Sequence, residues 1–276
     1  MRVASVQLAA SERSKEEQIE SATRLIEPLE GVDLLLLPEL WTTGAFCYER
    51  METEAEAFDG PTLHAMQEIA RRKNCHFYAG SWVEKSDAGL HNTAAFLSPS
   101  GEVLEYYHKI HLFRYQSREA ELMTPGQTPK VVSTPLGTFG LSTCYDLRFG
   151  ELFRILSDAG AECFLVCSGW PHQRLEHWQL FNRVRALENQ CYLISCNSCG
   201  KQDGLLYAGH SMVVDPWGIP QASAGDLETV MTADIELSLV AEARSKFPVL
   251  EDRVLKPDRG QPSSRFRARI VDAPPL

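Results

Sequence analysis

The most restrictive feature of the sequence is a run of mainly apolar residues at 32–37, which Pro38 ends. Strands that are apolar at consecutive positions are buried on both faces, so this run belongs inside a sheet that other elements cover from both sides. A second run, at 161–167, has the same character. Strand-like segments, some paired as hairpins, alternate along the chain with segments of helical periodicity. The pattern predicts an α/β fold in which mixed sheets are flanked by helices.

Capping residues, turn residues and periodicity predict where the other elements lie. Ser14 and Glu17 form a capping box that opens the first of four expected helices, at 14–29, 61–70, 147–156 and 172–189. Further strands are expected at 2–9, 76–83, 91–97, 102–107, 131–134, 138–143, 190–197, 206–214 and 228–235. The acidic segment 49–59 is predicted to be a solvated loop or short helix, and the segment 108–129 to be irregular.

Charge and apolar content exclude several classes of protein. The 276 residues carry a formal net charge of −10, which argues against a nucleic acid or an anionic membrane as a partner. No apolar run approaches the length of a membrane span, and the N-terminal segment alternates too much for a signal peptide. The eight cysteines are therefore expected to be reduced thiols in the cytoplasm.

The segment from Gly137 to Phe149 predicts a strand that stops abruptly at Cys144 and is followed by a helix. A thiol at such a bend lies beside free backbone N–H groups, and these together with the helix dipole favour the nucleophilic thiolate. The alternative is a buried cysteine that fills space in the core, as most free cysteines do.

Two further charged residues have unusual sequence surroundings. Glu39 follows the apolar run at 32–37, and the carboxyl ends of strands are where open α/β sheets place reactive groups. A partly desolvated carboxylate there would suit a general base, although a surface glutamate after a proline is an equal alternative. Lys109 lies among aromatic and aliphatic residues, so it is either a snorkelling side chain or a cation held in a site.

The segments around these residues resemble the signature segments of the carbon–nitrogen hydrolase (nitrilase) superfamily in sequence, order and separation. They are Pro38–Gly44, His108–Phe113 and Cys144–Phe149, and the resemblance continues through His177-Trp178, Arg185–Gln190, Gly209–Ser211, Asp215–Gly218 and Phe247–Arg253. It implies a four-layer αββα sandwich and a catalytic triad of Glu39, Lys109 and Cys144. It also implies a second glutamate six residues before a Pro-Gly pair, which is Glu119, with Glu121 as the alternative.

The same resemblance implies an assembly, and it implies neither a metal nor an organic cofactor. Two such sandwiches usually associate through their helical layers, so a homodimer or higher homo-oligomer is expected. The segment from about 244 onward, within a single domain of residues 1–276, lacks periodicity and is predicted to contribute to the dimer contacts. A zinc site is an alternative suggested by Cys196 and Cys199 with Cys163 and Cys167, but one C-x-x-C pair is a weak indication.

The residues after Cys144 resemble the amidase branch, and within it the ω-amidase-like group, which acts on small dicarboxylic monoamides such as 2-oxoglutaramate and succinamate. The resemblance implies release of ammonia through a thioester intermediate. Alternatives are an amidase for another acyl group (deaminated glutathione or aliphatic amides), an N-carbamoyl hydrolase, a nitrilase or a non-catalytic scaffold. Candidate substrate-binding residues, chosen by their proximity in sequence or their aromatic character, are Phe46, Tyr115, Tyr145, Arg148, Trp170 and His172.

Overall fold

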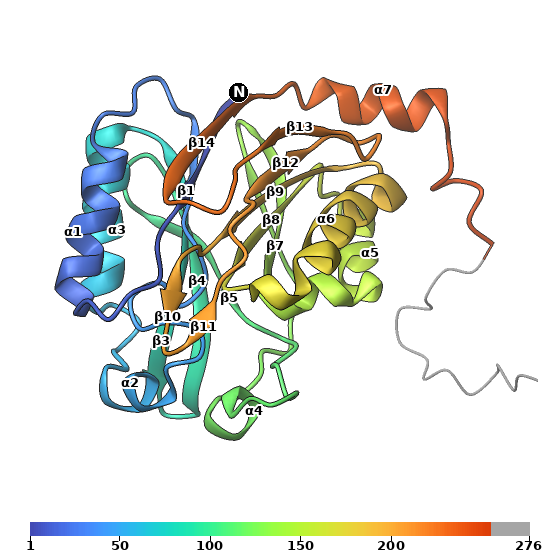
Figure 1. Ribbon diagram of the computed structural model, residues 1–276. Coiled ribbons are helices and arrows are strands. Elements are labelled where there is room, and N and C mark those ends of the chain that lie inside the picture. The colour runs from blue at the N-terminus through green and yellow to red at the C-terminus, as the bar shows by residue number, and fades with distance from the viewer. Residues whose placement is uncertain (255–276) are drawn as a thin grey trace, which may run out of the picture.

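Two six-stranded β-sheets form the frame of the computed structural model, which describes residues 1–254 (Figure 1). In order across the sheet, the first contains β14 (Thr229–Asp234), β1 (Arg2–Gln7), β2 (Leu34–Leu36), β3 (His76–Ser86), β4 (Gly89–Leu97) and β5 (Val103–His108). The second contains β13 (Pro220–Ser223), β12 (Met212–Val214), β9 (Tyr192–Asn197), β8 (Cys163–Ser168), β7 (Gly137–Thr143) and β6 (Lys130–Thr134). Both sheets are mixed.

The central strands of each sheet are parallel, and antiparallel strands flank them. In the first sheet β2 pairs in parallel with β1 and β3, and in the second β8 pairs in parallel with β7 and β9. All three leucines of β2 and the following Leu37 are buried. The apolar run therefore forms the central strand that its composition predicts.

Two pairs of helices cover the outer faces of the sheets (Figure 1). The pair α1 (Lys15–Ile26) and α3 (Pro61–Lys73) packs on the first sheet, and α5 (Gly150–Asp158) and α6 (Leu175–Asn189) pack on the second. Helix α1 begins with the predicted capping box, in which Ser14 and Glu17 satisfy each other's backbone N–H groups. The four layers are helix, sheet, sheet and helix, so the predicted αββα sandwich is confirmed.

The inner faces of the two sheets share one core, and both aromatic and polar contacts cross it. Phe96 of β4 stacks on Phe139 of β7 with ring centroids 5.5 Å apart. The hydroxyl of Tyr78, on β3, donates to the carbonyl oxygen of Ser142, on β7, over 3.1 Å. These contacts hold β3 and β4 against β7, so the carboxyl end of β7 lies close to the loop that follows β2.

Some predicted boundaries were wrong. Residues 144–148 form a 3₁₀ turn before α5, and residues 172–174 form another before α6, so both helices begin later than predicted. A helix, α7 (Ser238–Lys246), crosses the predicted start of the irregular tail, because its only fully buried residues, Val240 and Ala243, create little periodicity. Residues 255–276, which include most of the tail predicted to make dimer contacts, lie outside the described residues.

The remaining short elements border the site or the edges of the fold. They are α2 (Tyr48–Thr53), inside the acidic segment, α4 (Glu119–Leu122), inside the segment predicted to be irregular, and the hairpin of β10 (Lys201–Gln202) and β11 (Leu205–Leu206). None of the helices in residues 1–254 combines the length and apolar character that a membrane crossing requires.

Candidate active site

Cys144 lies at the carboxyl end of β7, where the chain turns sharply. Its φ of +46° is in the left-handed region that non-glycine residues rarely adopt, and such strained positions are frequent at functional sites. The turn is held by a capping box in which Thr143 N donates to Asp146 Oδ2 over 2.9 Å. A residue with positive φ cannot continue into a regular α-helix, which explains why a 3₁₀ turn separates Cys144 from α5.

Asp146 also connects this turn to the segment that carries Lys109. Its Oδ2 accepts a hydrogen bond from the Tyr107 hydroxyl at 2.7 Å, and its Oδ1 is 2.7 Å from Nδ1 of His111. The backbone N–H of His111 donates to the same Oδ1. One buried carboxylate thus fixes the turn at Cys144, in the second sheet, to the chain that leaves β5 in the first sheet.

Lys109 lies between two buried glutamates. Its Nζ is 2.7 Å from Glu39 Oε1, 2.8 Å from Glu119 Oε1 and 3.0 Å from Glu119 Oε2. All three residues are at most 4% exposed. Glu121 is instead exposed and lies 3.9 Å from Arg118. Of the two glutamates left open by the sequence, the structure places Glu119 in the site.

The backbone supplies further hydrogen bonds to the two glutamates. Gly169 N donates to Glu39 Oε2 over 2.9 Å, and Phe113 N donates to Glu119 Oε2 over 2.8 Å. A Cβ at position 169 would lie 2.5 Å from the Cβ of Ala45, so only glycine allows this close approach of the backbone. Both carboxylates therefore have fixed orientations, which reduces the cost of ordering them during a reaction.

The electrostatics of the cluster keep the lysine charged. Burial disfavours the ammonium, but the carboxylates of Glu119 and Glu39 outweigh it and raise the pKa of Lys109 well above its usual value. For Glu119, burial dominates over the attraction of Lys109 and raises the pKa of the carboxyl.

The resting state of Cys144 differs from the prediction made from its sequence surroundings. Burial and the nearby charge of Glu39 raise the pKa of the thiol well above its usual value, and Lys109 only partly offsets them. The expectation that N–H groups and a helix dipole would favour the thiolate was wrong, because no α-helix begins at Cys144 and a carboxylate lies beside it. The structure therefore favours a neutral thiol that needs a base.

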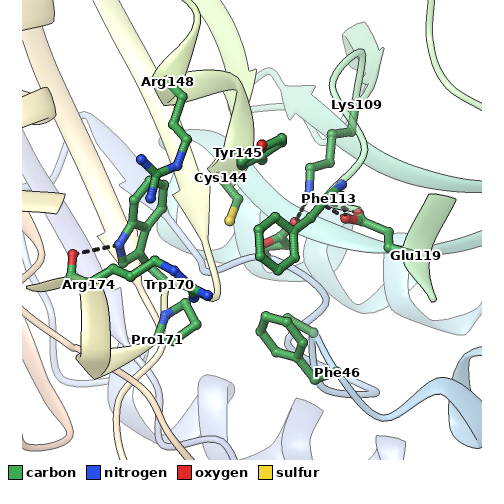
Figure 2. Close-up of a pocket in the computed structure, with 12 residues that line it drawn as sticks. Phe46, Lys109, Phe113, Glu119, Cys144, Tyr145, Arg148, Trp170, Pro171 and Arg174 are labelled. Atoms are coloured by element: carbon green, nitrogen blue, oxygen red, sulfur yellow. Dashed lines mark hydrogen bonds and ion pairs between the residues drawn. The ribbon is translucent and has the colours of Figure 1, made fainter. Parts of the chain in front are cut away.

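A cavity of about 370 Å³, counting its open mouth, adjoins these residues (Figure 2). Figure 2 shows the sulfur of Cys144 pointing into it, with Lys109 and Glu119 to one side and Trp170 and Arg148 to the other. Four of the predicted substrate-binding residues line the cavity, namely Phe46, Tyr145, Arg148 and Trp170. The thiol of Cys144 and its charged neighbours thus face a cavity whose wall includes several aromatic side chains.

Two predicted substrate-binding residues are not among those that line the cavity. Tyr115 is 61% exposed and lies under the guanidinium of Arg174, with 5.8 Å between Cζ and the ring centroid. His172 is exposed in the 3₁₀ turn before α6. Proximity in sequence suggested both residues, but the turn directs other side chains towards Cys144.

Comparison with known proteins agrees with this geometry. Residues 2–245 match the model of the carbon–nitrogen hydrolase family. The chain belongs to this family. It is 37% identical to the 2-oxoglutaramate amidase of Paenarthrobacter nicotinovorans, over 86% of this chain and 84% of that protein. It is 32% identical to the omega-amidase NIT2 of Xenopus tropicalis, over 87% of this chain and 90% of that protein.

A solved structure gives the same result for the fold. The carbon–nitrogen hydrolase superfamily protein XC1258 from Xanthomonas campestris superposes with a TM-score of 0.85 at 30% identity, covering 93% of this chain and 98% of that one. The resemblance found in the three signature segments is thus confirmed over the whole described fold, and the protein is an enzyme that hydrolyses carbon–nitrogen bonds.

Two guanidinium groups give the hydrolase cavity a cationic side. Arg148 lies over the Trp170 ring, with Cζ 4.8 Å from the centroid, and Arg174 lies over the Phe113 ring at 5.4 Å. The pKa of Arg148 is lowered, first by burial, and Arg174 adds to the effect as a nearby like charge. Within residues 1–254 neither guanidinium pairs with a carboxylate; Arg148 Nη2 lies 3.2 Å from His177 Nδ1.

Several residues that contact this site were not predicted from the sequence, and three of them carry polar or aromatic side chains. Phe113 and Arg174 line the cavity, and Asn92 of β4 donates hydrogen bonds to Glu39 and Glu119. Arg174 lies thirty positions from Cys144, and only the packing of α6 brings it back. Asn92 carried little indication in the sequence, because the polar residues His91 and Thr93 flank it in the predicted strand.

The four cysteines that suggested zinc are buried, and Cys167 and Cys196 lie opposite each other on neighbouring strands. Cys163 and Cys167 lie on β8 and Cys196 lies on β9, and all three pack among apolar residues between the sheets. In the part of the chain that the structure describes, histidine, cysteine, aspartate and glutamate side chains form no cluster of three arranged to hold a metal ion.

Proposed function

We propose that this carbon–nitrogen hydrolase is an amidase that releases ammonia from small monoamides of dicarboxylic acids, of the 2-oxoglutaramate and succinamate type. The single observation that carries the proposal is the pairing, in one cavity, of a buried Cys–Lys–Glu cluster with two arginines that have no carboxylate partner in the described chain. The names of the related amidases support the same substrate class.

Different residues of the cavity would contact the two ends of the substrate. The amide carbon would lie at the sulfur of Cys144, and the free carboxylate would lie against Arg148 and Arg174. Arginine binds carboxylates through parallel N–H donors, and such charge-assisted bonds are about twice as strong as neutral ones. The aromatic side chains of Phe46 and Phe113 would enclose the short carbon chain between the two ends.

In the first half of the reaction, Glu39 takes the proton of the Cys144 thiol and the sulfur attacks the amide carbon. The oxyanion that forms is stabilised by the Lys109 ammonium and by the backbone N–H of Tyr145. The carbon–nitrogen bond then breaks, and Glu39 returns the proton to the departing nitrogen. Ammonia leaves, and the acyl group remains as a thioester on Cys144.

In the second half, Glu39 takes a proton from water and the resulting hydroxide attacks the thioester carbon. The same cationic site stabilises the second oxyanion. The carbon–sulfur bond breaks, and the sulfur regains the proton from Glu39. The products are a dicarboxylic acid and one ammonia molecule, and the enzyme returns to its starting protonation state without any redox step.

The first experiment is ammonia release from dicarboxylic monoamides, neutral aliphatic amides, nitriles and N-carbamoyl compounds, with Cys144→Ala as the control. Release from the monoamides that disappears in the control supports the proposal. Activity confined to nitriles, carbamoyl compounds or neutral amides would overturn the substrate class. If no compound released ammonia and Cys144 did not react with iodoacetamide, the result would favour a non-catalytic scaffold.

One variant tests how the carboxylate is recognised. Arg174→Gln removes a guanidinium and keeps the backbone oxygen that accepts the Trp170 indole N–H at 2.9 Å. We expect KM for the monoamide to rise about 10- to 100-fold, the value of one or two charge-assisted hydrogen bonds. Arg183→Gln, on the part of α6 that contacts Gly218, is the matched control. Equal KM values for the two variants would contradict the assignment.

We also propose that the chain acts as a single domain and as a homodimer in the cytoplasm. The eight cysteines form no disulfide, which suits a reducing compartment. Large apolar side chains are exposed on the helical layer of the second sheet, with Ile155 of α5 44%, Leu180 of α6 58% and Leu187 of α6 51% exposed. A layer of this kind suits burial against a second copy. Sedimentation equilibrium at the monomer mass would contradict the dimer.

A further inference from the structure

Asn92 contacts every charged member of the cluster. It lies on β4 and is 1% exposed. Its Nδ2 donates to Glu39 Oε1 over 2.9 Å and to Glu119 Oε1 over 3.2 Å. Its backbone oxygen accepts the N–H of Lys109 at 2.9 Å. The proposed mechanism assigns no role to this residue, although it is the next group that both carboxylates contact after Lys109.

The hydrogen bonds that Asn92 and Lys109 donate determine which oxygen of Glu39 keeps an unused acceptor position. An amide nitrogen has two hydrogens, and both are used here, one on each glutamate. Lys109 donates to the same two oxygens. Oε1 of Glu39 therefore accepts two hydrogen bonds, whereas Oε2 accepts one, from Gly169. The unused acceptor position on Oε2 is the one available for the proton of Cys144.

The remaining atom of the amide fixes its orientation. Oδ1 of Asn92 is buried without a hydrogen-bond partner, which costs free energy. The flipped amide would satisfy no carboxylate and would direct its oxygen at two negative groups, which is worse. An aspartate would place a third carboxylate beside Glu39 and Glu119, and a leucine would fill the space without donating. Only the asparagine geometry serves both glutamates.

The side chain of Asn92 lies on one face of the first sheet, and a separate set of hydrogen-bonded polar side chains lies on the opposite face. Side chains alternate across a strand, so His91 and Thr93 point away from the site. There the Thr93 hydroxyl donates to Glu84 Oε2 at 2.7 Å, and His108 Nε2 is 2.9 Å from the same oxygen. Thr93 is thus a buried hydrogen-bonding neighbour of Asn92 with no contact to the reacting groups.

We propose that Asn92 is a positioning residue for the hydrolysis. By donating to both glutamates it sets the spacing of the carboxylates around Lys109 and leaves Oε2 of Glu39 as the oxygen that exchanges protons with Cys144. The inference rests on the proposed function of Glu39 as the base. It does not depend on which amide is the substrate.

The test compares Asn92→Leu and Asn92→Asp with Thr93→Val in the full chain. Two readouts are measured as functions of pH: steady-state amide hydrolysis, and the rate at which iodoacetamide alkylates Cys144, followed by mass spectrometry of its peptide. The second readout needs no substrate, so failure of the substrate proposal and failure of this one are separable. Melting temperatures of all variants are recorded alongside.

For Asn92→Leu we expect kcat to fall about 10- to 100-fold with little change in KM, because a misplaced base affects the chemical step more than binding. The acidic limb of both pH profiles should move to higher pH, since the carboxylates lose a donor that stabilises their charge. Asn92→Asp should lose more activity than Asn92→Leu.

Thr93→Val removes a buried hydrogen bond of the same kind from the opposite face of β4. It should lower the melting temperature by a similar amount and leave both pH profiles in place. If Asn92→Leu behaved like Thr93→Val, with unshifted profiles and activity lost only in proportion to folded protein, Asn92 would be merely structural. Unchanged kcat would equally overturn the proposal.

Discussion

At the scale of single residues, the site contains two opposing effects of burial. Burial raises the pKa of Cys144 and so keeps its side chain in the neutral thiol form, which is less reactive than a thiolate. The same burial strengthens the attraction of Lys109 for its two glutamates, because charges interact more strongly when water is excluded. In the proposed mechanism the proton would therefore leave the sulfur as the bond to carbon forms, because the site does not hold a stable thiolate.

The two nearby glutamates allow a direct comparison at this scale. Glu119→Gln keeps the side-chain shape but takes one negative charge from Lys109, and it places an amide where two donors converge. We expect kcat to fall about 100-fold or more, as losses of charge stabilisation in active sites do. Glu121→Gln, on the exposed side of α4, should have wild-type kcat.

The pH dependence provides a second check on the same pair. Burial raises the pKa of Glu119, so this carboxyl gains its proton at a higher pH than an exposed glutamate as the solution is acidified. Activity that needs the charged form should therefore decline early on the acidic side. Rate profiles of the wild type and Glu121→Gln should share this decline. An active Glu119→Gln variant with full kcat would refute the role of Glu119.

At the scale of elements, helix α6 packs against the turn that contains Cys144 and stabilises it. Arg185 is 6% exposed, and its Nε and Nη2 donate to the carbonyl oxygens of Leu147 and Arg148 over 3.0 and 2.9 Å. A Cβ on Gly150 would lie 3.1 Å from Nη1 of Arg185, so the guanidinium packs directly against the start of α5. Through these contacts α6 holds a turn that is strained at Cys144.

Replacing this guanidinium with an ammonium should loosen the turn. Arg185→Lys cannot bond both carbonyls with one rigid fork, so we expect a loss of about 1–3 kcal/mol in the free energy of unfolding. Displacement of the thiol should lower kcat about tenfold. Arg183→Lys, two positions earlier on α6, is the control for helix effects. The test measures urea unfolding and kcat of both variants. Equal losses of stability and kcat in Arg185→Lys and Arg183→Lys would contradict the role of Arg185.

The elements also show which features the sequence could predict. The run at 32–37, the capping box at Ser14 and the strand ending at Cys144 are local patterns. The capping box and the strand before Cys144 occur as predicted, and the run forms a shorter strand, Leu34–Leu36. The later start of α5 was missed because it follows from the positive φ of Cys144, which no composition reveals. Arg174 and Asn92 were missed because their contacts with the site depend on how distant segments pack.

At the scale of the whole molecule, the site exists only when both sheets are in place. Glu39 and Lys109 follow strands of the first sheet, and Cys144 follows a strand of the second. The Tyr78 hydroxyl and the Asp146 carboxylate connect the two sheets within this region. Packing of the sandwich core and assembly of the active site are therefore one event, and loss of core stability should remove activity at the same time.

Because buried thiols resist ionisation, the free energy of unfolding should fall as the pH rises into the alkaline range. Burial raises the pKa of Cys163 well above the ordinary value of 9.0, so in the folded protein it stays protonated when the unfolded chain ionises. The thiol therefore costs no stability below pH 9 and costs an increasing amount as the pH rises from there towards the folded pKa. Between pH 8 and pH 10 one such thiol should lower the free energy of unfolding by about 1.4 kcal/mol.

This cost can be isolated by comparing two core substitutions on β8. Cys163→Ala removes the ionising group, whereas Val166→Ala removes only apolar volume from an equally buried site. Both variants should be less stable than the wild type at pH 8. At pH 10 the deficit of Cys163→Ala should shrink by about 1.4 kcal/mol, while that of Val166→Ala stays constant. Urea unfolding at the two pH values measures these deficits. If both deficits changed equally between pH 8 and pH 10, Cys163 would ionise equally in the folded and the unfolded protein.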